Sequence, residues 1–510
     1  MKSIRKRLLL MVPVVAIFAL FFATTVYAQD GTPPTAEQVS DISLSINIMW
    51  MIIGGFLVFF MQAGFALVET GFTRNKNVTH TMMMNIMVFC VGAVGYWLTG
   101  FAFQFGGVNA AYPAVTTVGA VAGEWAHSPI TLGDWTGLLS SPLLRFGQFG
   151  ILGGTGFLLT GIPVATSGVF SFFLFQMVFM DTAATIPTGS MAERLKFIGF
   201  VLMGLWVSMF IYPLVGGWVW GGGWLQNLGR ISGWGNGAVD FAGSGVVHMI
   251  GGAVGLAGAI VIGPRIGKFN KDGSANAIPG HNITIGILGT IILFFGWFGF
   301  NPGSSLGFLG ASRDLAVLAA VNTLLAGAVG GFAAMTYMWT LGPSKKPDAG
   351  MSVNGTLAGL VAITAPCAFV DPWAAVVIGL VAGLLVCWAS VVLEKLKIDD
   401  PVGAVPVHFV NGAWGVLAVG LFANANPETA GWNGMESAVT GLFYGGGTQI
   451  LAQLTEVISI FVVVAGLSYL FFKVLAGAKL LRVDAEVEIG GLDMPEMGSL
   501  AYPADWEPAK

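Results

Sequence analysis

Two stretches of the sequence match each other in register: residues 240–255, DFAGSGVVHMIGGAVG, and residues 400–415, DPVGAVPVHFVNGAWG. They are identical at seven of sixteen positions, and each has an Asp at its first position and a His eight residues later. An Asp at the start of a helix accepts hydrogen bonds from free backbone N–H groups and is favoured by the helix dipole. The pattern therefore indicates an internal repeat of two helices, each of which carries one histidine.

The composition identifies the environment of these helices. Of the 510 residues, 55% are hydrophobic and only 9% are charged, whereas about 25% of residues are charged in an average soluble domain. Lipid accepts apolar surface that water does not, so the composition indicates a helical protein within a lipid bilayer. It argues against nucleic-acid-binding proteins and cytosolic enzymes. The three cysteines lack CxxC spacing, which argues against disulfides and a structural zinc site.

Apolar stretches long enough to cross about 30 Å of hydrocarbon recur along the chain. We expect eleven transmembrane helices, near residues 43–70, 79–104, 164–188, 196–222, 241–263, 282–300, 314–341, 351–370, 373–393, 404–423 and 448–475. The repeat histidines fall on the fifth and the tenth, and an offset of five helices reverses the direction of the second copy. The predicted fold is an all-α polytopic membrane protein with two inverted five-helix repeats and a final helix.

The charged residues that flank the spans predict an orientation. Four cations precede an apolar run over residues 8–22 and small residues at 26–28, which indicates a cleavable signal peptide over 1–28, with an uncleaved anchor as the alternative. Residues 29–480 then form the membrane domain, and 481–510 an acidic cytosolic tail. Eleven Lys and Arg residues lie in loops placed inside and three in loops placed outside, as the positive-inside rule requires. We expect a multi-pass protein of the inner cell membrane, with its N-terminus periplasmic and its C-terminus cytoplasmic.

The two histidines are expected to meet near the bilayer centre. At about 1.5 Å per residue, His248 and His408 each lie roughly 12 Å from the Asp that begins their helix, and the helices enter from opposite faces. Facing imidazoles can share a proton and offer their other nitrogens to a small neutral molecule such as ammonia. Two alternatives stay open: each His is only a hydrogen-bonded core residue, or the pair ligates a haem.

Aromatic residues gather at the predicted outer ends of three spans. They are Phe175 and Phe179 on the third, Trp220 at the end of the fourth, and Trp297, Phe298 and Phe300 on the sixth, before Asn301-Pro302-Gly303-Ser304. Aromatic faces attract cations, and a hydroxyl oxygen accepts hydrogen bonds from them. The pattern favours a cation site at the outer mouth, although each aromatic alone is also typical of an interfacial belt or a core.

Several motifs together resemble the ammonium transporter family, which includes methylammonium permeases and Rhesus proteins. The matching stretches are residues 240–265, residues 182–194 (TAATIPTGSMAER), residues 296–304 (GWFGFNPGS), Asn322-Thr323, residues 399–401 with His408, and residues 491–493 (GLD). The resemblance covers nearly the whole predicted mature chain. The bacterial-type Amt branch fits better than the Rhesus branch because Trp220 and Ser304 are present.

The resemblance implies a role for each candidate residue. Ammonium is recruited by Trp220, Phe179 and Ser304, and Asp240 shapes this site from its helix cap. A stacked gate is formed by Phe179 and Phe300. The pore contains the histidine pair His248 and His408, and its wall is lined by Trp297 and Thr364. The family also implies a homotrimer with one pore per subunit and a tail that can meet a trimeric PII-type nitrogen regulator. It implies no cofactor, metal or enzymatic activity.

The implied function is ammonium transport. NH4⁺ gives up its proton in the apolar lumen, because desolvation disfavours the charge, and passes the histidines as ammonia while the proton crosses separately. The competing interpretation is an ammonium sensor that signals through a cytosolic partner, and the short tail favours transport.

Two positions depart from the family pattern. Asp181 stands where many relatives have a small apolar residue, and we expect it to face another helix and to have a structural partner there. Met497 and Ser499 replace the His and Glu of a Glu-His-Gly-Glu run, which weakens the expectation of a PII-type regulator.

Overall fold

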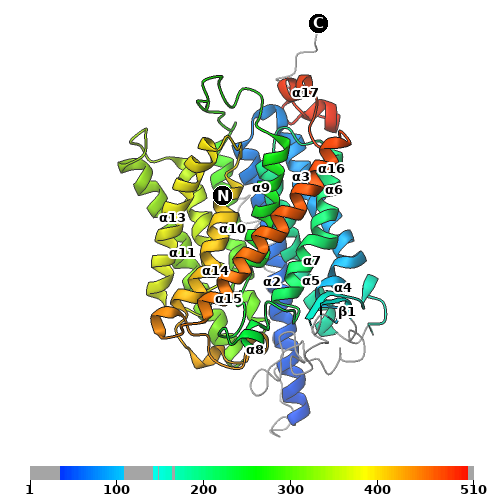
Figure 1. Cartoon of the computed structure of the whole chain (residues 1–510), viewed down its shortest axis with the longest axis vertical. Coiled ribbons are helices and arrows are strands. Elements are labelled where there is room, and N and C mark those ends of the chain that lie inside the picture. The colour runs from blue at the N-terminus through cyan, green and yellow to red at the C-terminus, as the bar shows by residue number, and fades with distance from the viewer. Residues whose placement is uncertain (1–34, 108–141, 147–148, 163–166, 504–510) are drawn as a thin grey trace, which may run out of the picture. The chain divides into compact units, whose positions relative to one another are not determined.

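The computed structural model describes residues 35–107, 142–146, 149–162 and 167–503 (Figure 1). The chain divides into a short unit that ends at Ser45 and contains the beginning of helix α2 (Ala36–Phe72), and a main unit that begins at Ile46. The predicted signal peptide over residues 1–28 lies outside the described residues.

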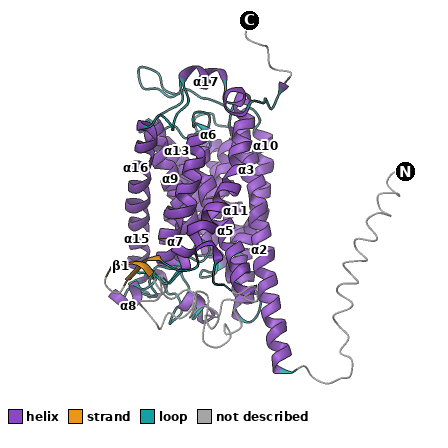
Figure 2. Ribbon diagram, turned by 90° about the vertical axis from the view of Figure 1, so that its right-hand side faces the viewer, coloured by secondary structure: helices purple, strands orange, loops and turns teal. Residues whose placement is uncertain are grey.

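Ten helical segments of the described chain are long and apolar enough to cross a membrane. They are Ala36–Phe72, Asn75–Phe105, Ser167–Met191, Phe197–Val219, Ser244–Ile262, Ile283–Ser305, Ala311–Thr340, Pro372–Lys395, Val405–Phe422 and Gln449–Gly477. An eleventh apolar helix, α12 (Ala349–Thr364), has 16 residues. Each segment overlaps one predicted stretch, and the predicted all-α polytopic membrane fold with eleven apolar helices is confirmed. Figure 2 shows the helices packed side by side in one bundle.

Several spans contain a π-helical turn, which joins two α-helices in the second, fourth and last spans and begins the fifth and tenth spans. The second contains α3 (Val78–Gly95), η2 (Tyr96–Gly100) and α4 (Phe101–Phe105), the fourth α6 (Phe197–Trp206), η7 (Val207–Ile211) and α7 (Tyr212–Val219), the fifth η8 (Ser244–Met249) and α9 (Ile250–Ile262), the tenth η10 (Val405–Val410) and α14 (Asn411–Phe422), and the last α15 (Gln449–Ser459), η14 (Ile460–Ala465) and α16 (Gly466–Gly477). The other helices are α5 (Ser167–Met191), α8 (Leu228–Ser232), α10 (Ile283–Phe300) with η9 (Pro302–Ser305), α11 (Ala311–Thr340) and α13 (Pro372–Lys395). Single π-turns often mark functional sites, and η8 and η10 carry the repeat histidines.

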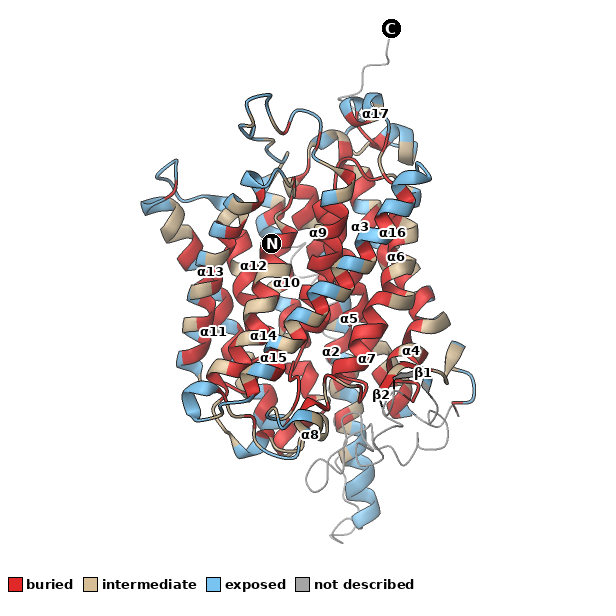
Figure 3. Ribbon diagram, viewed as in Figure 1, coloured by how far each residue is buried: buried red, intermediate tan, exposed pale blue. Residues whose placement is uncertain are grey.

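The long helices approach closely where small residues face each other. A Cβ added at Gly71 of α2 would lie 2.6 Å from the backbone nitrogen of Gly286 on α10. A Cβ at Gly355 of α12 would lie 2.7 Å from the carbonyl oxygen of Gly330 on α11. Larger side chains would separate these backbones, as is common in membrane bundles. Burial therefore concentrates inside the bundle, while large apolar side chains such as Ile291 stay exposed on its outside (Figure 3).

The two copies of the repeat share one local conformation. Gly243 and Gly403 occupy matching positions and have φ angles of 112° and 81°, which glycine adopts without a steric cost. Asp240 accepts hydrogen bonds from the N–H groups of residues 243–246, and Asp400 accepts them from residues 403 and 405. Both predicted Asp caps are therefore present, one at the start of η8 and one at the start of η10.

These two caps lie at opposite ends of the bundle. The backbone carbonyl of Asp240 accepts a hydrogen bond from Trp220 at the end of α7, where Trp218 donates to the carbonyl of Ile151 on strand β2 (Phe149–Gly153). Asp399, next to the other cap, bonds to Arg265, near the C-terminal helix α17 (Ala485–Gly490). The predicted inverted arrangement of the repeats is confirmed.

The long connection after α4 contains regular structure where it is described. Strand β1 (Pro142–Phe146) pairs antiparallel with β2 (Phe149–Gly153). Gly154 donates a backbone hydrogen bond to Gly106, directly after α4. This part of the connection is therefore a strand pair that is joined to the end of α4, and residues 108–141 lie outside the described residues.

The acidic C-terminal segment packs on the loops at one end of the bundle. Glu488 of α17 is buried and pairs with Arg482 at 2.9 Å, and it accepts a hydrogen bond from the backbone of Ile266. Asp493, which begins η15 (Asp493–Met497), accepts one from the backbone of His80. Carboxylates of this acidic tail thus bind it to the membrane domain.

A buried ion cluster connects the loops of the two halves at the same end. Arg265 bonds to Asp399 at 2.8 Å and to Glu193 at 3.0 Å, and Glu193 also pairs with Arg74. Burial alone would raise the pKa of Asp399, but hydrogen bonds from Arg265 and the charges of Arg194 and Arg265 lower it to about 2. Asp399 therefore stays ionised at every physiological pH.

Candidate functional site

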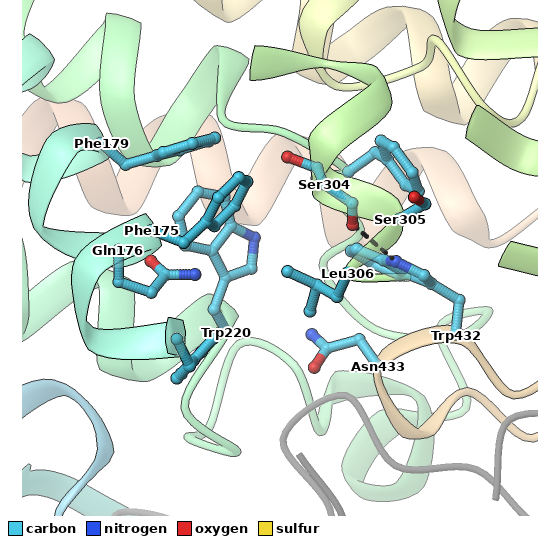
Figure 4. Close-up of a pocket in the computed structure, with 11 residues that line it drawn as sticks. Phe175, Gln176, Phe179, Trp220, Ser304, Ser305, Leu306, Trp432 and Asn433 are labelled. Atoms are coloured by element: carbon cyan, nitrogen blue, oxygen red, sulfur yellow. Dashed lines mark hydrogen bonds between the residues drawn. The ribbon is translucent and has the colours of Figure 1, made fainter. Parts of the chain in front are cut away.

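Aromatic side chains enclose a recess at the end of the bundle that carries β1 and β2 (Figure 4). It contains about 480 Å³ of empty space. The lining residues are Phe172, Phe175, Gln176, Phe179, Trp220, Phe241, Ser304, Ser305, Leu306, Trp432 and Asn433. Since none of these side chains carries a charge, a cation in the recess would meet aromatic faces and neutral oxygen acceptors.

Trp220 and Ser304 stand on opposite sides of this recess. The indole N–H of Trp220 donates to the carbonyl of Asp240 at 2.7 Å, and the ring meets Phe179 edge-on, with 6.2 Å between centroids. The Ser304 hydroxyl donates to the carbonyl of Phe300 at 2.8 Å. Because a hydroxyl has one hydrogen, the Ser304 oxygen can then only accept a bond from a ligand. The site therefore favours a cation that donates hydrogen bonds.

Asp240 is spatially close to the recess but is absent from its lining. Its two carboxylate oxygens accept four backbone hydrogen bonds of 2.7–3.0 Å at the start of η8. Its carbonyl holds Trp220. Asp240 thus positions the recess and the histidine-bearing turn without reaching the space that a ligand would occupy.

Two stacked phenyl rings close the inner side of the recess. Phe179 and Phe300 have ring centroids 4.0 Å apart and an interplanar angle of 21°, and Phe175 lies 4.6 Å from Phe179. The ring of Phe300 also lies 5.4 Å from that of His248. A molecule that moves from the recess to the histidines must therefore displace these rings.

The two repeat histidines meet beyond the rings. Nδ1 of His248 lies 3.2 Å from Nδ1 of His408, and both side chains are buried. A hydrogen bond between two neutral imidazoles needs opposite tautomers, so one Nε2 is left as a donor and the other as an acceptor. Nitrogens this close leave no room for a porphyrin between them. Among the described residues, no cluster of three His, Cys, Asp or Glu side chains could hold a metal ion.

An aromatic wall fixes one of the two imidazoles. His248 stacks on Trp297 with 5.1 Å between centroids and an angle of 21°, and the Trp297 indole donates to the hydroxyl of Thr364 at 2.9 Å. Within the described chain, Nε2 of His248 has no hydrogen-bond partner. The predicted site residues are thus brought together in one continuous series from the recess to the histidines, except Phe298, which stacks on Phe294.

The sequence decides the family to which this arrangement belongs. Residues 49–502 match the model of the Ammonium Transporter Family. The chain belongs to this family. Among curated ammonium transporters, it is 41% identical to Amt2 of Archaeoglobus fulgidus, over 95% of this chain and 94% of the relative. It is 35% identical to ammonium transporter 1 member 3 of Solanum lycopersicum, over 92% of this chain and 95% of the relative.

Solved structures of the Ammonium Transporter Family share the fold. A protein described as a sensor Amt protein superposes with a TM-score of 0.73 at 36% identity, and the match covers 90% of this chain and 99% of that chain. Mep2 of Candida albicans superposes with a TM-score of 0.68 at 25% identity, over 91% of this chain and 92% of that chain. The eleven-helix architecture is therefore that of the ammonium transporters, which are transport proteins and not an enzyme family.

The sequence did not predict several walls of the recess. Trp432 lies in the connection between α14 and α15, where its indole donates to the carbonyl of Ser304 at 3.4 Å and its ring stacks on Phe241. Gln176 lies one turn from Phe179 on α5 and adds an amide. The signal for Trp432 in the sequence was a single tryptophan in a glycine-rich connection. Phe241 directly follows the cap residue Asp240, so its place near the recess could also have been predicted.

Asp181 lies on α5 away from the aromatic recess. Its side chain is 2% exposed on α5 and does not line the recess. Within the described chain, its Oδ1 atom has no hydrogen-bond partner. The structural partner expected for Asp181 therefore stays a prediction.

Proposed function

We propose that this ammonium transporter binds NH4⁺ in the aromatic recess and passes it through the membrane as ammonia, with the proton crossing separately. The observation that carries the proposal is the series of an uncharged aromatic recess, a closed pair of phenyl rings and a buried pair of hydrogen-bonded imidazoles. Each part suits one step in the passage of this substrate.

The recess offers a means of selection. Cation–π attraction to a desolvated aromatic site contributes about 2 kcal/mol, and Ser304 adds an acceptor whose own hydrogen is already used. Potassium can use the aromatic faces but donates no hydrogen bond. Ammonium is therefore favoured over potassium at the stage of binding.

The space beyond the rings favours the neutral form of the substrate. Phe300, Trp297 and the two histidines are buried, and their ring contacts are with one another and with other aromatic rings, so a charged ion among these rings would lose its hydration without a charged partner there. Ammonia keeps both a donor and an acceptor role, which the two Nε2 atoms complement. The proton shared between the Nδ1 atoms gives the pair a path for proton transfer.

The wider assembly is part of the same proposal. We place the recess on the outer side of the inner cell membrane, the C-terminus in the cytoplasm, and three subunits in a homotrimer with one pore each. A PII-type nitrogen regulator is the candidate partner of the tail. The packing of α17 on the membrane domain supports a tail that can report to the pore.

Transport assays test the proposal against sensing. We expect the purified chain in proteoliposomes to give a current after an ammonium jump and no current after a potassium jump. In Ser304→Ala, the current should be lost at low ammonium and regained at high ammonium. Ammonium binding without flux of charge or ammonia would replace the proposal with a sensor.

A further inference from the structure

A second recess adjoins His408 from the opposite end of the bundle. It has about 340 Å³ of empty space between α2, α5, α10, α12 and η10. His408 and Glu69 both line it, together with Phe65, Asn354 and Val402. Because Val402 follows Asp399 and Asp400, this recess lies at the end that carries α17. The transport path described from the aromatic recess to His408 thus continues into a space that contains one carboxyl group.

Glu69 is held there by neutral donors. The side chain is 3% exposed, its Oε1 accepts a hydrogen bond from the Thr188 hydroxyl at 2.7 Å, and its Oε2 accepts one from the Asn85 amide at 2.9 Å. Within the described chain, Glu69 forms no salt bridge. An ion pair would fix a carboxylate in its charged form, and Glu69 lacks that constraint.

The other ionisable groups on the surrounding elements are already engaged or lie elsewhere. They are His80 on α3, Asp181 on α5, Glu193 after α5, Asp399 and Asp400 before η10, and His408 on η10. Glu193 and Asp399 bond to Arg265, and Asp400 caps η10. His408 is the one that shares the recess with Glu69.

The hydrogen bonds around Glu69 accommodate either protonation state. The Thr188 hydroxyl lies 2.7 Å from Glu69 Oε1 and 2.6 Å from the carbonyl oxygen of Thr185. With a carboxylate, the Thr188 hydroxyl donates to Oε1. With a carboxylic acid, Oε1–H donates to Thr188, whose hydrogen then turns to the Thr185 carbonyl. Asn85 donates to Oε2 in both cases, so a proton can come and go without leaving an unpaired polar atom.

Glycine keeps the approach to this carboxyl open. A Cβ at Gly189 of α5 would lie 3.4 Å from Glu69 Oε1 and 3.3 Å from the side chain of Val402. Any larger residue would therefore fill the recess beside Oε1. A small molecule that has passed His408 can reach the carboxyl group there.

We propose that Glu69 is the proton-transfer residue that rebuilds ammonium at the inner end of the pore. The inference rests on the proposed function, in which a proton and ammonia cross separately. The proton that ammonium releases on the outer side reaches Glu69 through His248 and His408 and forms the carboxylic acid. Ammonia then takes it: the O–H bond of Glu69 breaks, the nitrogen lone pair forms the new N–H bond, and NH4⁺ leaves beside a carboxylate that accepts the next proton.

The decisive variant is Glu69→Gln. The glutamine amide can keep the same hydrogen-bond partners. Its Nε2 donates to the Thr188 hydroxyl, which donates to the Thr185 carbonyl, and its Oε1 accepts from the Asn85 amide. The amide cannot, however, carry the transferred proton. The matched control is Glu394→Gln at the same end, where the carboxylate is 51% exposed and pairs with Lys268. Current and internal alkalinisation are recorded together in proteoliposomes after an ammonium jump.

We expect Glu69→Gln to lower the current at least tenfold while ammonia still enters and raises the internal pH, and we expect Glu394→Gln to match the native chain. Glu69→Asp, which restores a carboxyl group, should regain part of the current, and this tests the proposal if Glu69→Gln is poorly folded. Three results would overturn the proposal. They are a fall of current and ammonia flux together in Glu69→Gln, a native current in Glu69→Gln, and a folded Glu69→Asp that does not regain current. The absence of current in the native chain would instead refute the separate crossing of the proton.

Discussion

Replacing Trp220 by leucine tests the aromatic recess most sharply, because the same helix supplies a matched control. Trp220 and Trp218 both lie at the end of α7, and both side chains are 6% exposed. The indole of Trp220 donates to the carbonyl of Asp240, and that of Trp218 donates to the carbonyl of Ile151. Only Trp220 lines the recess. Trp220→Leu and Trp218→Leu therefore remove similar buried area and one similar hydrogen bond, but only the first removes an aromatic face from the site.

The expected effect follows from the cation–π interaction. A desolvated site loses about 2 kcal/mol with its aromatic face, and since each 1.4 kcal/mol changes affinity tenfold, the apparent KM for ammonium should rise about 30-fold in Trp220→Leu. The maximal current should change much less, because the rings of Phe179 and Phe300 and the histidine pair stay in place.

The assay is the initial current in proteoliposomes as a function of ammonium concentration, corrected for the amount of protein inserted. Trp218→Leu should keep a KM within about threefold of the native value, even if its yield falls. Equal shifts in the two variants, or a Trp220→Leu KM close to the native value, would refute the reasoning that the recess binds ammonium through this ring.

Three further outcomes are expected. Asp240→Asn leaves one side-chain oxygen to accept hydrogen bonds from four N–H groups. Because each hydrogen bond to a charged group contributes about 1.5–3 kcal/mol, the thermal midpoint of unfolding in detergent should fall clearly, whereas the exposed Asp314→Asn should leave it unchanged. An unchanged midpoint in Asp240→Asn would contradict the role of Asp240 as a helix cap. The pKa of Asp399 is lowered from 3.8 to about 2, which corresponds to about 2 kcal/mol of stability. This contribution is fully present above pH 4 and is lost as the pH falls towards 2, so the stability difference between the native chain and Asp399→Asn should stay constant from pH 7 to pH 4.5. A difference that disappears near pH 6 would argue against the ion cluster. Glu488→Gln breaks the ion pair with Arg482 and should speed limited proteolysis of the tail about tenfold or more. Glu486→Gln, which changes an exposed neighbour, should leave the proteolysis rate unchanged. Equal rates in the two variants would mean that other contacts hold the tail.

The architecture could be predicted because a membrane imposes simple rules on sequence. Each span needs a long apolar run, and the Asp and His residues that interrupt the runs at equal spacing revealed the repeat. The matching Gly243 and Gly403 have positive φ because the chain turns sharply between each Asp cap and the π-turn that follows it. The turns themselves were not predictable, since residues in a π-turn are as apolar as those in an α-helix.

The candidate site was predicted where its residues lie on spans and missed where they do not. Phe179, Phe300 and Trp297 stand on helices whose direction was known, so their convergence followed from the fold. Trp432 reaches the recess from a long connection, whose path is set by tertiary contacts such as its bond to Ser304 and not by local pattern. Glu69 was missed for another reason: it was counted within an apolar span, and its role depends on Thr188 and Asn85 from two other helices.

The most direct test of the central claim is the ratio of charge to ammonia moved. Current and internal pH are recorded together in proteoliposomes for the native chain, for His248→Ala and for His281→Ala, a histidine outside the spans that contacts Thr73 and Tyr502. We expect about one charge per ammonia in the native chain and in His281→Ala, and loss of the charge movement in His248→Ala. Ammonia flux without current in the native chain, or an unchanged ratio in His248→Ala, would contradict the central claim.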